Sequence, residues 1–183
     1  EHNMVAEIEC NGVARRFLLG GYIDRTDCLH LPDGDRIRIV DYKTGSKQPG
    51  KTTIDDLFDK EKCSKHDHIF QTFYYSLVLD HDPAFEHKAI APALMYSSTK
   101  CGKNHSGIVK LDKNADDTEK DKTVNDFNAI CGRDFQNRLF ELIRHIFSNG
   151  EEDRFFTQCD DEQDCAYCDF LSICQRHPSK RTF

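Results

Sequence analysis

The sequence predicts one mixed domain of the α/β or α+β class, because segments with strand and helix periodicity follow one another in the order ββαββα. The chain has 183 residues, 38% of them hydrophobic, which is enough for a single core. A cysteine-rich segment follows the last predicted helix. We therefore divide the chain into a core domain at residues 1–150 and a C-terminal segment at residues 151–183.

Two predicted strands near the N-terminus form a hairpin. Residues 14–28 are rich in β-forming side chains and end in a strict alternation, which predicts one strand. Residues 32–35 (Pro-Asp-Gly-Asp) have the composition of a turn, so residues 36–44 are expected to return as the second strand. Because side chains alternate along a strand, one face of this second strand carries Ile37, Ile39, Asp41 and Lys43.

The remaining elements are two helices and two strands. Apolar side chains recur at helical spacing over residues 66–80, which predicts an amphipathic helix with one broad buried face. Residues 89–98 and 108–111 are expected to be strands. Residues 124–147 carry a second helical pattern, and the Asn-Gly pair at residues 149–150 is a stop signal.

Charge and composition narrow the possible functions. The net charge of −7 argues against a general basic surface for nucleic acid, although lysines between residues 43 and 65 leave room for a local basic patch. No segment approaches the roughly 18 consecutive apolar residues of a membrane span, and the first residues have no export signal. We therefore expect a cytoplasmic protein without membrane contact. In a reducing compartment, nine cysteines point to a metal or cluster site.

Charged residues of the predicted hairpin suggest a divalent metal site. Asp24 lies near the end of the first strand, and Asp41 and Lys43 project from one face of the second. Two carboxylates ~4 Å apart repel by roughly 4 kcal/mol at an effective dielectric of about 20, so a cation between them is favoured. Mg²⁺ prefers such oxygens and can activate water for attack on a phosphoryl group. The alternative is an exposed Asp–Lys salt bridge of little energetic value.

Three motifs then occur in a fixed order: Gly-Tyr-Ile-Asp-Arg-Thr-Asp at residues 21–27, Ile-Val-Asp-Tyr-Lys-Thr-Gly at residues 39–45, and Gln71-x-x-x-Tyr75. Together they resemble the PD-(D/E)XK nuclease superfamily, in its RecB-like and AddB-like branch. The resemblance implies a restriction-endonuclease-like α/β core, with a mixed sheet flanked by helices. It implies that Asp24, Asp41 and the Tyr42 carbonyl bind Mg²⁺ or Mn²⁺ and that Lys43 is catalytic. It also implies that Gln71 and Tyr75, on one helix face, position DNA and the lysine.

The C-terminal cysteines supply a second resemblance. The spacing Cys165-x2-Cys168-x5-Cys174 is similar to the C-terminal part of the iron-sulfur staple of AddB-type nucleases. A [4Fe-4S] cluster needs four thiolates, and Cys159 or Cys10 could supply the fourth by count alone. A zinc site is the competing metal centre, and a trio without any metal is the third possibility. The isolated cysteines are expected to be core or surface thiols: Cys28, Cys63, Cys101 and Cys131.

The resemblance implies a metal-dependent DNA nuclease, specifically an exonuclease domain of a helicase-nuclease in DNA repair and recombination. Its expected partners are DNA and a helicase subunit or helicase region. Family members usually have a helix before the first strand, so we expect this chain to be the C-terminal part of a larger nuclease. Two alternatives stay open: a catalytically silent DNA-binding or scaffolding domain, and a zinc-stapled interaction module.

Other polar residues receive weaker assignments. Glu7 and Glu9 could add a metal ligand, but a solvated strand edge is the preferred interpretation. Lys47 and Lys51, in the loop after the motif, either contact phosphates or belong to a solvated loop. The histidines around the first predicted helix are expected at the surface: His66, His68, His81 and His87.

Overall fold

The computed structural model describes residues 1–44, 52–97, 107–112, 122–148, 165 and 168–175. Its strands are β1 (His2–Cys10), β2 (Val13–Gly21), β3 (Arg25–Leu31), β4 (Gly34–Lys43), β5 (Ala89–Tyr96), β6 (Lys110–Leu111) and β7 (Lys122–Thr123). Its α-helices are α1 (Ile54–Phe58), α2 (Asp67–Asp80), α3 (Arg133–Phe147) and α4 (Leu171–Cys174). Short 3₁₀ turns lie at Cys63–Lys65 and Pro83–Phe85, and a π-helical turn lies at Asn128–Gly132.

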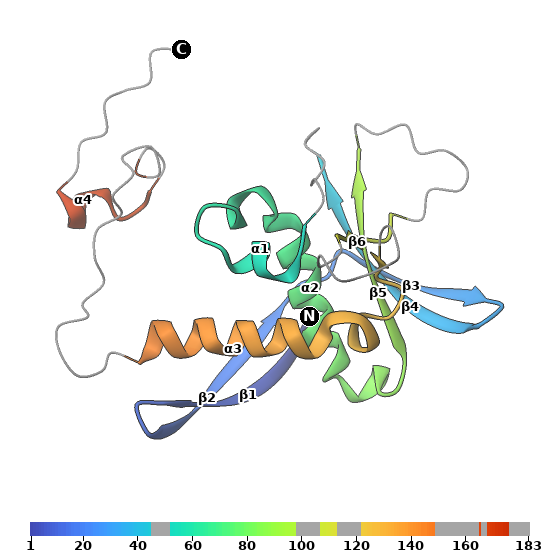
Figure 1. The fold of residues 1–183 in the computed structure, drawn as a ribbon, viewed down its shortest axis with the longest axis horizontal. Helices are drawn as coiled ribbons and strands as arrows, with labels where there is room; N and C mark the ends of the chain where they lie inside the picture. The colour runs from blue at the N-terminus through green and yellow to red at the C-terminus, as the bar shows by residue number, and fades with distance from the viewer. Residues whose placement is uncertain (45–51, 98–106, 113–121, 149–164, 166–167, 176–183) are drawn as a thin grey trace, which may run out of the picture.

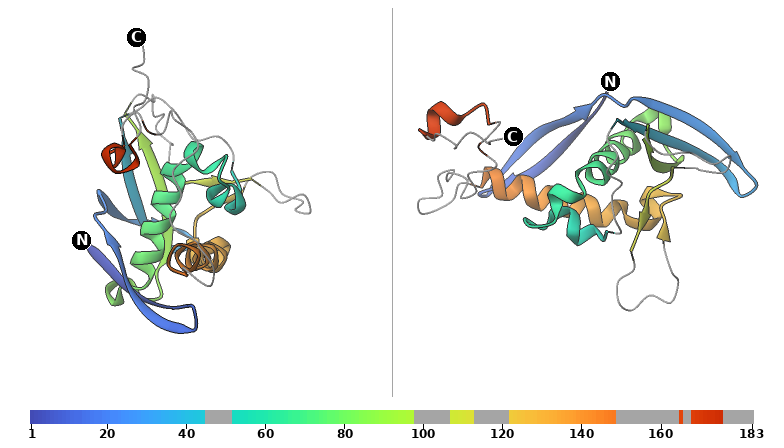
Figure 2. Two further views of the ribbon diagram at one scale, coloured as in Figure 1. Left: turned by 90° about the vertical axis from the view of Figure 1, so that its left-hand side faces the viewer. Right: turned by 90° about the horizontal axis from the view of Figure 1, so that it is seen from above.

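The central sheet is mixed and has the strand order β3-β4-β5. Strand β3 runs antiparallel to β4, while β4 and β5 run parallel. Parallel neighbours need a crossover connection, and α1 and α2 form it here. Helix α2 packs against β4 and β5. The β3-β4-β5 sheet and the β1-β2 sheet both lie on one side of helices α1, α2 and α3 (Figures 1 and 2). The predicted α/β class and mixed sheet flanked by helices are confirmed.

A second, two-stranded sheet pairs β1 with β2. Alternate side chains of β1 are buried in the core: Met4, Ala6, Ile8 and Cys10. Glu7 and Glu9 are exposed on the opposite face, as a solvated strand requires. The strand-edge interpretation of Glu7 and Glu9 agrees with β1, although the predicted element order did not include this strand.

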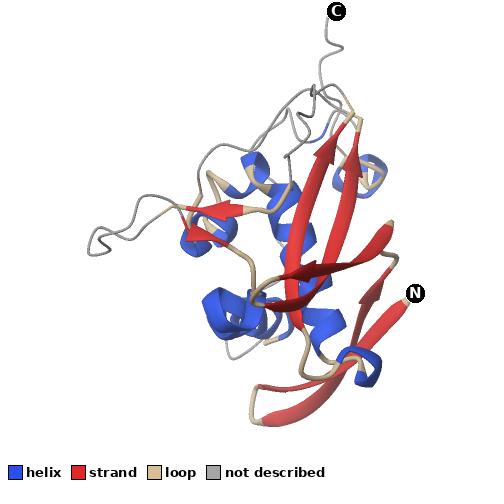
Figure 3. Cartoon of the chain, turned by 90° about the vertical axis from the view of Figure 1, so that its right-hand side faces the viewer, coloured by secondary structure: helices blue, strands red, loops and turns tan. Residues whose placement is uncertain are grey.

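The prediction of one continuous strand over residues 14–28 is wrong. Strand β2 ends at Gly21 and β3 begins at Arg25, so three residues form a bend between two different sheets (Figure 3). Strand β2 pairs with β1, whereas β3 pairs with β4. Local β-propensity is high on both sides of the bend, and only the choice of pairing partner separates the two strands. The bend carries Asp24.

Aromatic side chains dominate the core between α2 and α3. Phe73, Phe127 and Phe135 are fully buried, and the rings of Phe73 and Phe135 meet edge to face at 5.7 Å between centroids. Both predicted helices are confirmed in their main part as α2 and α3. The second was predicted over residues 124–147 but begins later as an α-helix, because a π-helical turn precedes α3. No helix among the described residues has the length and apolar character needed to cross a membrane.

The predicted surface position of His66 is wrong. His66 was expected at the surface, but it is 8% exposed, directly before α2. Of the two positions expected for the Cys131 thiol, the structure shows the core one, in the π-helical turn, where burial raises its pKa to about 12. A thiol with this pKa stays protonated and chemically inert near neutral pH.

Candidate active site

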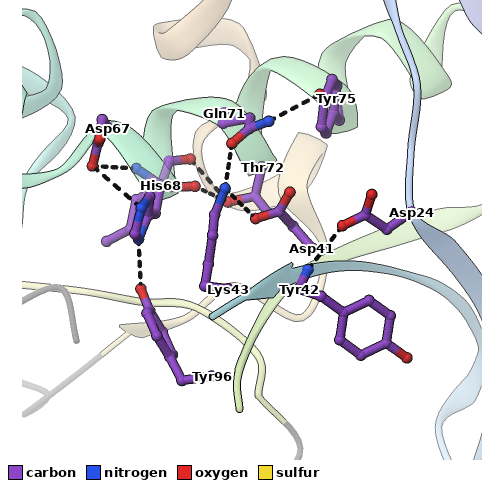
Figure 4. Close-up of polar contacts among 11 residues, drawn as sticks. Asp24, Asp41, Tyr42, Lys43, Asp67, His68, Gln71, Thr72, Tyr75 and Tyr96 are labelled. Atoms are coloured by element: carbon purple, nitrogen blue, oxygen red, sulfur yellow. Dashed lines mark hydrogen bonds and ion pairs between the residues drawn. The ribbon is translucent and has the colours of Figure 1, made fainter. Parts of the chain in front are cut away.

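The predicted acid and lysine of β4 lie side by side on the face that α2 covers (Figure 4). Asp41 is 4% exposed, and the Nζ atom of Lys43 is 2.7 Å from its Oδ2 atom. Apart from this ion pair, Asp41 Oδ2 is buried without an aligned hydrogen-bond donor among the described residues. A buried carboxylate is costly unless it is paired, and the Lys43 ammonium supplies that pairing at Oδ2.

Asp24 reaches the same place from the bend between β2 and β3. Its Oδ2 atom accepts a hydrogen bond of 2.9 Å from the backbone N–H of Tyr42, the residue between Asp41 and Lys43. The Tyr42 side chain lies on the other side of β4, half exposed, and its hydroxyl accepts a hydrogen bond from Arg25. The structure thus brings together the three charged residues that the sequence predicted, and the bend is what aims Asp24 at β4.

A side chain of helix α2 hydrogen-bonds to the Lys43 ammonium. The Oε1 atom of Gln71 accepts a hydrogen bond of 2.5 Å from Lys43 Nζ. The Nε2 atom of the same amide donates a hydrogen bond of 3.0 Å to the hydroxyl of Tyr75 (Figure 4). The Gln-x-x-x-Tyr pair is therefore one connected unit, in which Tyr75 fixes the amide and the amide fixes the ammonium. With Asp41 as the second partner, the Lys43 side chain has a defined position.

Glycine at position 21 allows α2 to approach the end of β2. A Cβ atom at Gly21 would lie 2.8 Å from Cε1 of the Tyr75 ring, which is closer than side-chain carbons approach. Beside it, the Tyr74 hydroxyl donates a hydrogen bond to the Gly20 carbonyl, and burial raises the pKa of Tyr74. The strand that leads into the Asp24 bend is thus packed directly against the helix that positions Lys43.

Two residues of the site were missed by the sequence analysis. Tyr96 on β5 is the register partner of Lys43, and its hydroxyl lies 3.0 Å from Nδ1 of His68 on α2. Burial, helped by the charges of Asp67 and Asp41, raises the pKa of Tyr96 to about 12, so it remains a neutral phenol. His68 is only partly exposed, which corrects its expected surface position. The sequence contains a signal that His68 lies near the site, because His68 precedes Gln71 by three residues and shares its helical face.

A family model described as the PD-(D/E)XK nuclease superfamily matches residues 1–175. The chain belongs to this superfamily. No curated protein and no solved structure matches the chain. The matched residues include Asp24, Asp41, Lys43, Gln71 and Tyr75, whose roles stay predictions.

PD-(D/E)XK nucleases generally use Mg²⁺ or Mn²⁺, and the oxygens of this site fit such a hard cation. The carboxylates of Asp24 and Asp41 and the Tyr42 carbonyl are the candidate ligands. The Asp41 carboxylate is the strongest local indication, because it is a nearly fully buried oxygen ligand at 4% exposure. Their role as ligands stays a prediction.

The C-terminal cysteines are only partly described. Cys165 is buried, and Cys168 and Cys174 are partly exposed. The Cys168 N–H donates a hydrogen bond of 3.2 Å to the Cys165 carbonyl. Cys10, the last residue of β1, is fully buried as part of the hydrophobic core. Cys159, Cys101, Lys47 and Lys51 lie outside the described residues. The iron-sulfur and zinc assignments of this segment stay predictions.

Proposed function

We propose that this protein is a metal-dependent DNA nuclease that hydrolyses phosphodiester bonds at the Asp24–Asp41–Lys43 site. One observation carries the proposal: a nine-tenths-buried carboxylate lies beside an ammonium group that a second element, α2, holds by a 2.5 Å hydrogen bond. A simple surface salt bridge would need neither the burial of Asp41 nor the Gln71–Tyr75 support. The membership of the PD-(D/E)XK superfamily agrees with this chemistry.

Each residue has a definable task in that reaction. Asp24 and Asp41 would hold the Mg²⁺ or Mn²⁺ ion, which supplies polarisation of the phosphate and a more acidic bound water. Lys43 would hydrogen-bond the attacking water or steady the negative charge that grows on the phosphoryl oxygens. Gln71 orients the Lys43 ammonium, and Tyr75 orients the Gln71 amide. Because the hydrogen bonds are in place before substrate arrives, little reorganisation is required.

The biological setting that we propose is an exonuclease domain of a DNA repair or recombination helicase-nuclease. The net charge of −7 supports this setting, because an acidic chain gains little non-specific affinity for DNA and benefits from delivery by a linked partner. In the same setting, Cys165, Cys168 and Cys174, with Cys159 as a candidate fourth ligand, would hold a [4Fe-4S] cluster or a zinc ion. Metal analysis of the purified chain distinguishes iron from zinc.

The proposed activity is tested by cleavage of end-labelled linear DNA with Mg²⁺ or Mn²⁺, against EDTA. The native chain is compared with Asp41→Asn and Lys43→Ala, and Lys110→Ala, an exposed lysine of β6, is the matched control. We expect the two site variants to lose about 10²-fold or more of the rate and the control to keep it. Cleavage that persists in EDTA or in Lys43→Ala would contradict the proposal. DNA binding without any metal-dependent cleavage would favour the silent-domain alternative.

A further inference from the structure

The tip of the β3–β4 hairpin carries a cluster of three possible metal ligands that the nuclease chemistry does not use. Cys28 and His30 lie on β3 and Asp35 lies on β4. Each offers one ligand atom, a sulfur, a ring nitrogen and a carboxylate oxygen, and these three atoms lie within 4.8 Å of one another. All three residues are exposed, so an ion from solvent can reach them.

The hairpin register explains why these side chains converge. His30 pairs directly with Asp35, and Cys28, two residues earlier on β3, points to the same side as His30. The turn that joins the strands is held by Arg36, whose guanidinium makes two hydrogen bonds to the Asp33 carboxylate, at 2.6 and 2.9 Å. This pairing also holds the pKa of Asp33 below its usual value. The backbone positions of the three ligands are therefore fixed before any ion binds.

We propose that Cys28, His30 and Asp35 form a transition-metal site, with Zn²⁺ as its ion. A thiolate, an imidazole and a carboxylate are the ligand types of zinc, and three protein ligands leave the fourth tetrahedral position to water. The thiolate and the carboxylate together neutralise the charge of the ion. A mixed sulfur, nitrogen and oxygen set is unsuited to Mg²⁺, which requires oxygen ligands.

The distance between His30 and Asp35 needs only a small adjustment to hold an ion, and the Cys28 sulfur lies within 4.8 Å of both ligand atoms. His30 Nδ1 and Asp35 Oδ1 are 2.8 Å apart, as in a hydrogen bond. Zinc bonds of about 2.0 to 2.2 Å at tetrahedral angles separate neighbouring ligand atoms by about 3.4 Å. The zinc ion would thus replace the shared proton after an opening of about half an ångström. The His30 and Asp35 side chains are 77% and 65% exposed, so no packing opposes this movement.

The cluster is separate from the proposed active site. Asp35 and Asp41 lie on the same strand, six residues apart, which corresponds to about 20 Å at roughly 3.3 Å per residue. The two places also differ in chemistry, because Asp24 and Asp41 offer oxygen ligands only. The zinc site therefore does not depend on the proposed nuclease function, and its test uses no DNA.

The first experiment measures how fast Cys28 is alkylated by iodoacetamide in the complete chain, resolved by peptide mass spectrometry. Cys28 is exposed and should react readily in the metal-free protein. We expect Zn²⁺ to slow its alkylation at least 10-fold and Mg²⁺ to have no effect. In His30→Ala the protection by zinc should disappear, and the partly exposed Cys63 is the internal control in every sample. Equal alkylation rates of Cys28 with and without zinc would overturn the proposal.

The second experiment counts tightly bound zinc by competition with a chelating dye. The native chain is compared with Cys28→Ser, Asp35→Asn and the matched control Cys63→Ser, so that any zinc held by the C-terminal cysteines is common to all samples. We expect Cys28→Ser to lose one equivalent and Asp35→Asn to bind that equivalent at least 10-fold more weakly, since even residues behind a ligand cost 10- to 100-fold. An unchanged stoichiometry and affinity in Cys28→Ser would refute the site.

Discussion

The hydrogen bond between Gln71 and Lys43 gives the sharpest test of how this site is organised. In Gln71→Ala, Lys43 Nζ loses its 2.5 Å acceptor and Tyr75 loses its amide partner, while the Lys43–Asp41 ion pair remains. The ammonium is then held by Asp41 alone and can rotate away from the position that Gln71 gives it. Gln71→Ala therefore removes positioning without removing any charged group of the site.

The size of the effect follows from the charge of the donor. A hydrogen bond that involves an ionised group contributes about 1.5 to 3 kcal/mol. If the whole of this energy is expressed in the transition state, the cleavage rate falls about 10- to 150-fold, at about 1.4 kcal/mol per factor of ten. The free energy of unfolding should change far less, by about 1 kcal/mol, because Gln71 is only partly buried.

The assay is single-turnover cleavage of end-labelled DNA with the chain in excess over substrate, which separates the chemical step from binding. Asn137→Ala, an exposed amide on α3, is the matched control and should behave like the native chain. The reasoning is refuted if Gln71→Ala cleaves within threefold of the native rate. It is equally refuted if only the apparent DNA affinity falls while the saturated rate is unchanged, because Gln71 would then hold DNA and not Lys43.

Three further predictions address the core, the approach of α2 and the pH dependence of stability. Phe135→Ala should lower the free energy of unfolding by about 3 to 5 kcal/mol in urea, because the fully buried ring meets several aromatic neighbours. Gly21→Ala should displace the Tyr75 ring and lower the cleavage rate by up to about 10²-fold. The Lys62 ammonium and the α1 cap lower the pKa of Asp56 to about 2, so Asp56→Asn should cost about 1 kcal/mol at pH 7.

Phe135→Ala has a matched control, and the Asp56→Asn effect has a defined pH dependence. Phe147→Ala, at a 45% exposed ring, should cost much less than Phe135→Ala, and equal losses would contradict the assigned core. The Asp56 carboxylate has a lower pKa in the folded chain than the ordinary 3.8, so its contribution is present above pH 4 and is lost as pH falls toward 2. A deficit of Asp56→Asn that stays constant down to pH 2 would contradict this assignment.

Much of the site could be predicted because its residues are close in sequence or share a simple period. Asp41 and Lys43 are two apart on a strand, and Gln71 and Tyr75 are four apart on a helix, so each pair must share a face. His68 was accessible by the same rule but was judged to be an ordinary surface histidine. Tyr96 was not accessible, because its place beside Lys43 depends on the parallel pairing of β4 with β5 across more than fifty residues.

The sequence by itself determined the class of the fold and the central helix, since local periodicity dictates which side chains share a face, and the resemblance of its motifs indicated the residues of the proposed site. The tertiary structure alone decided where the chain leaves one sheet and enters another. That choice depends on the strands with which β2 and β3 pair, and no pattern within residues 14–28 records it. Because Asp24 lies in the resulting bend, long-range pairing places it against the Tyr42 amide and completes the site.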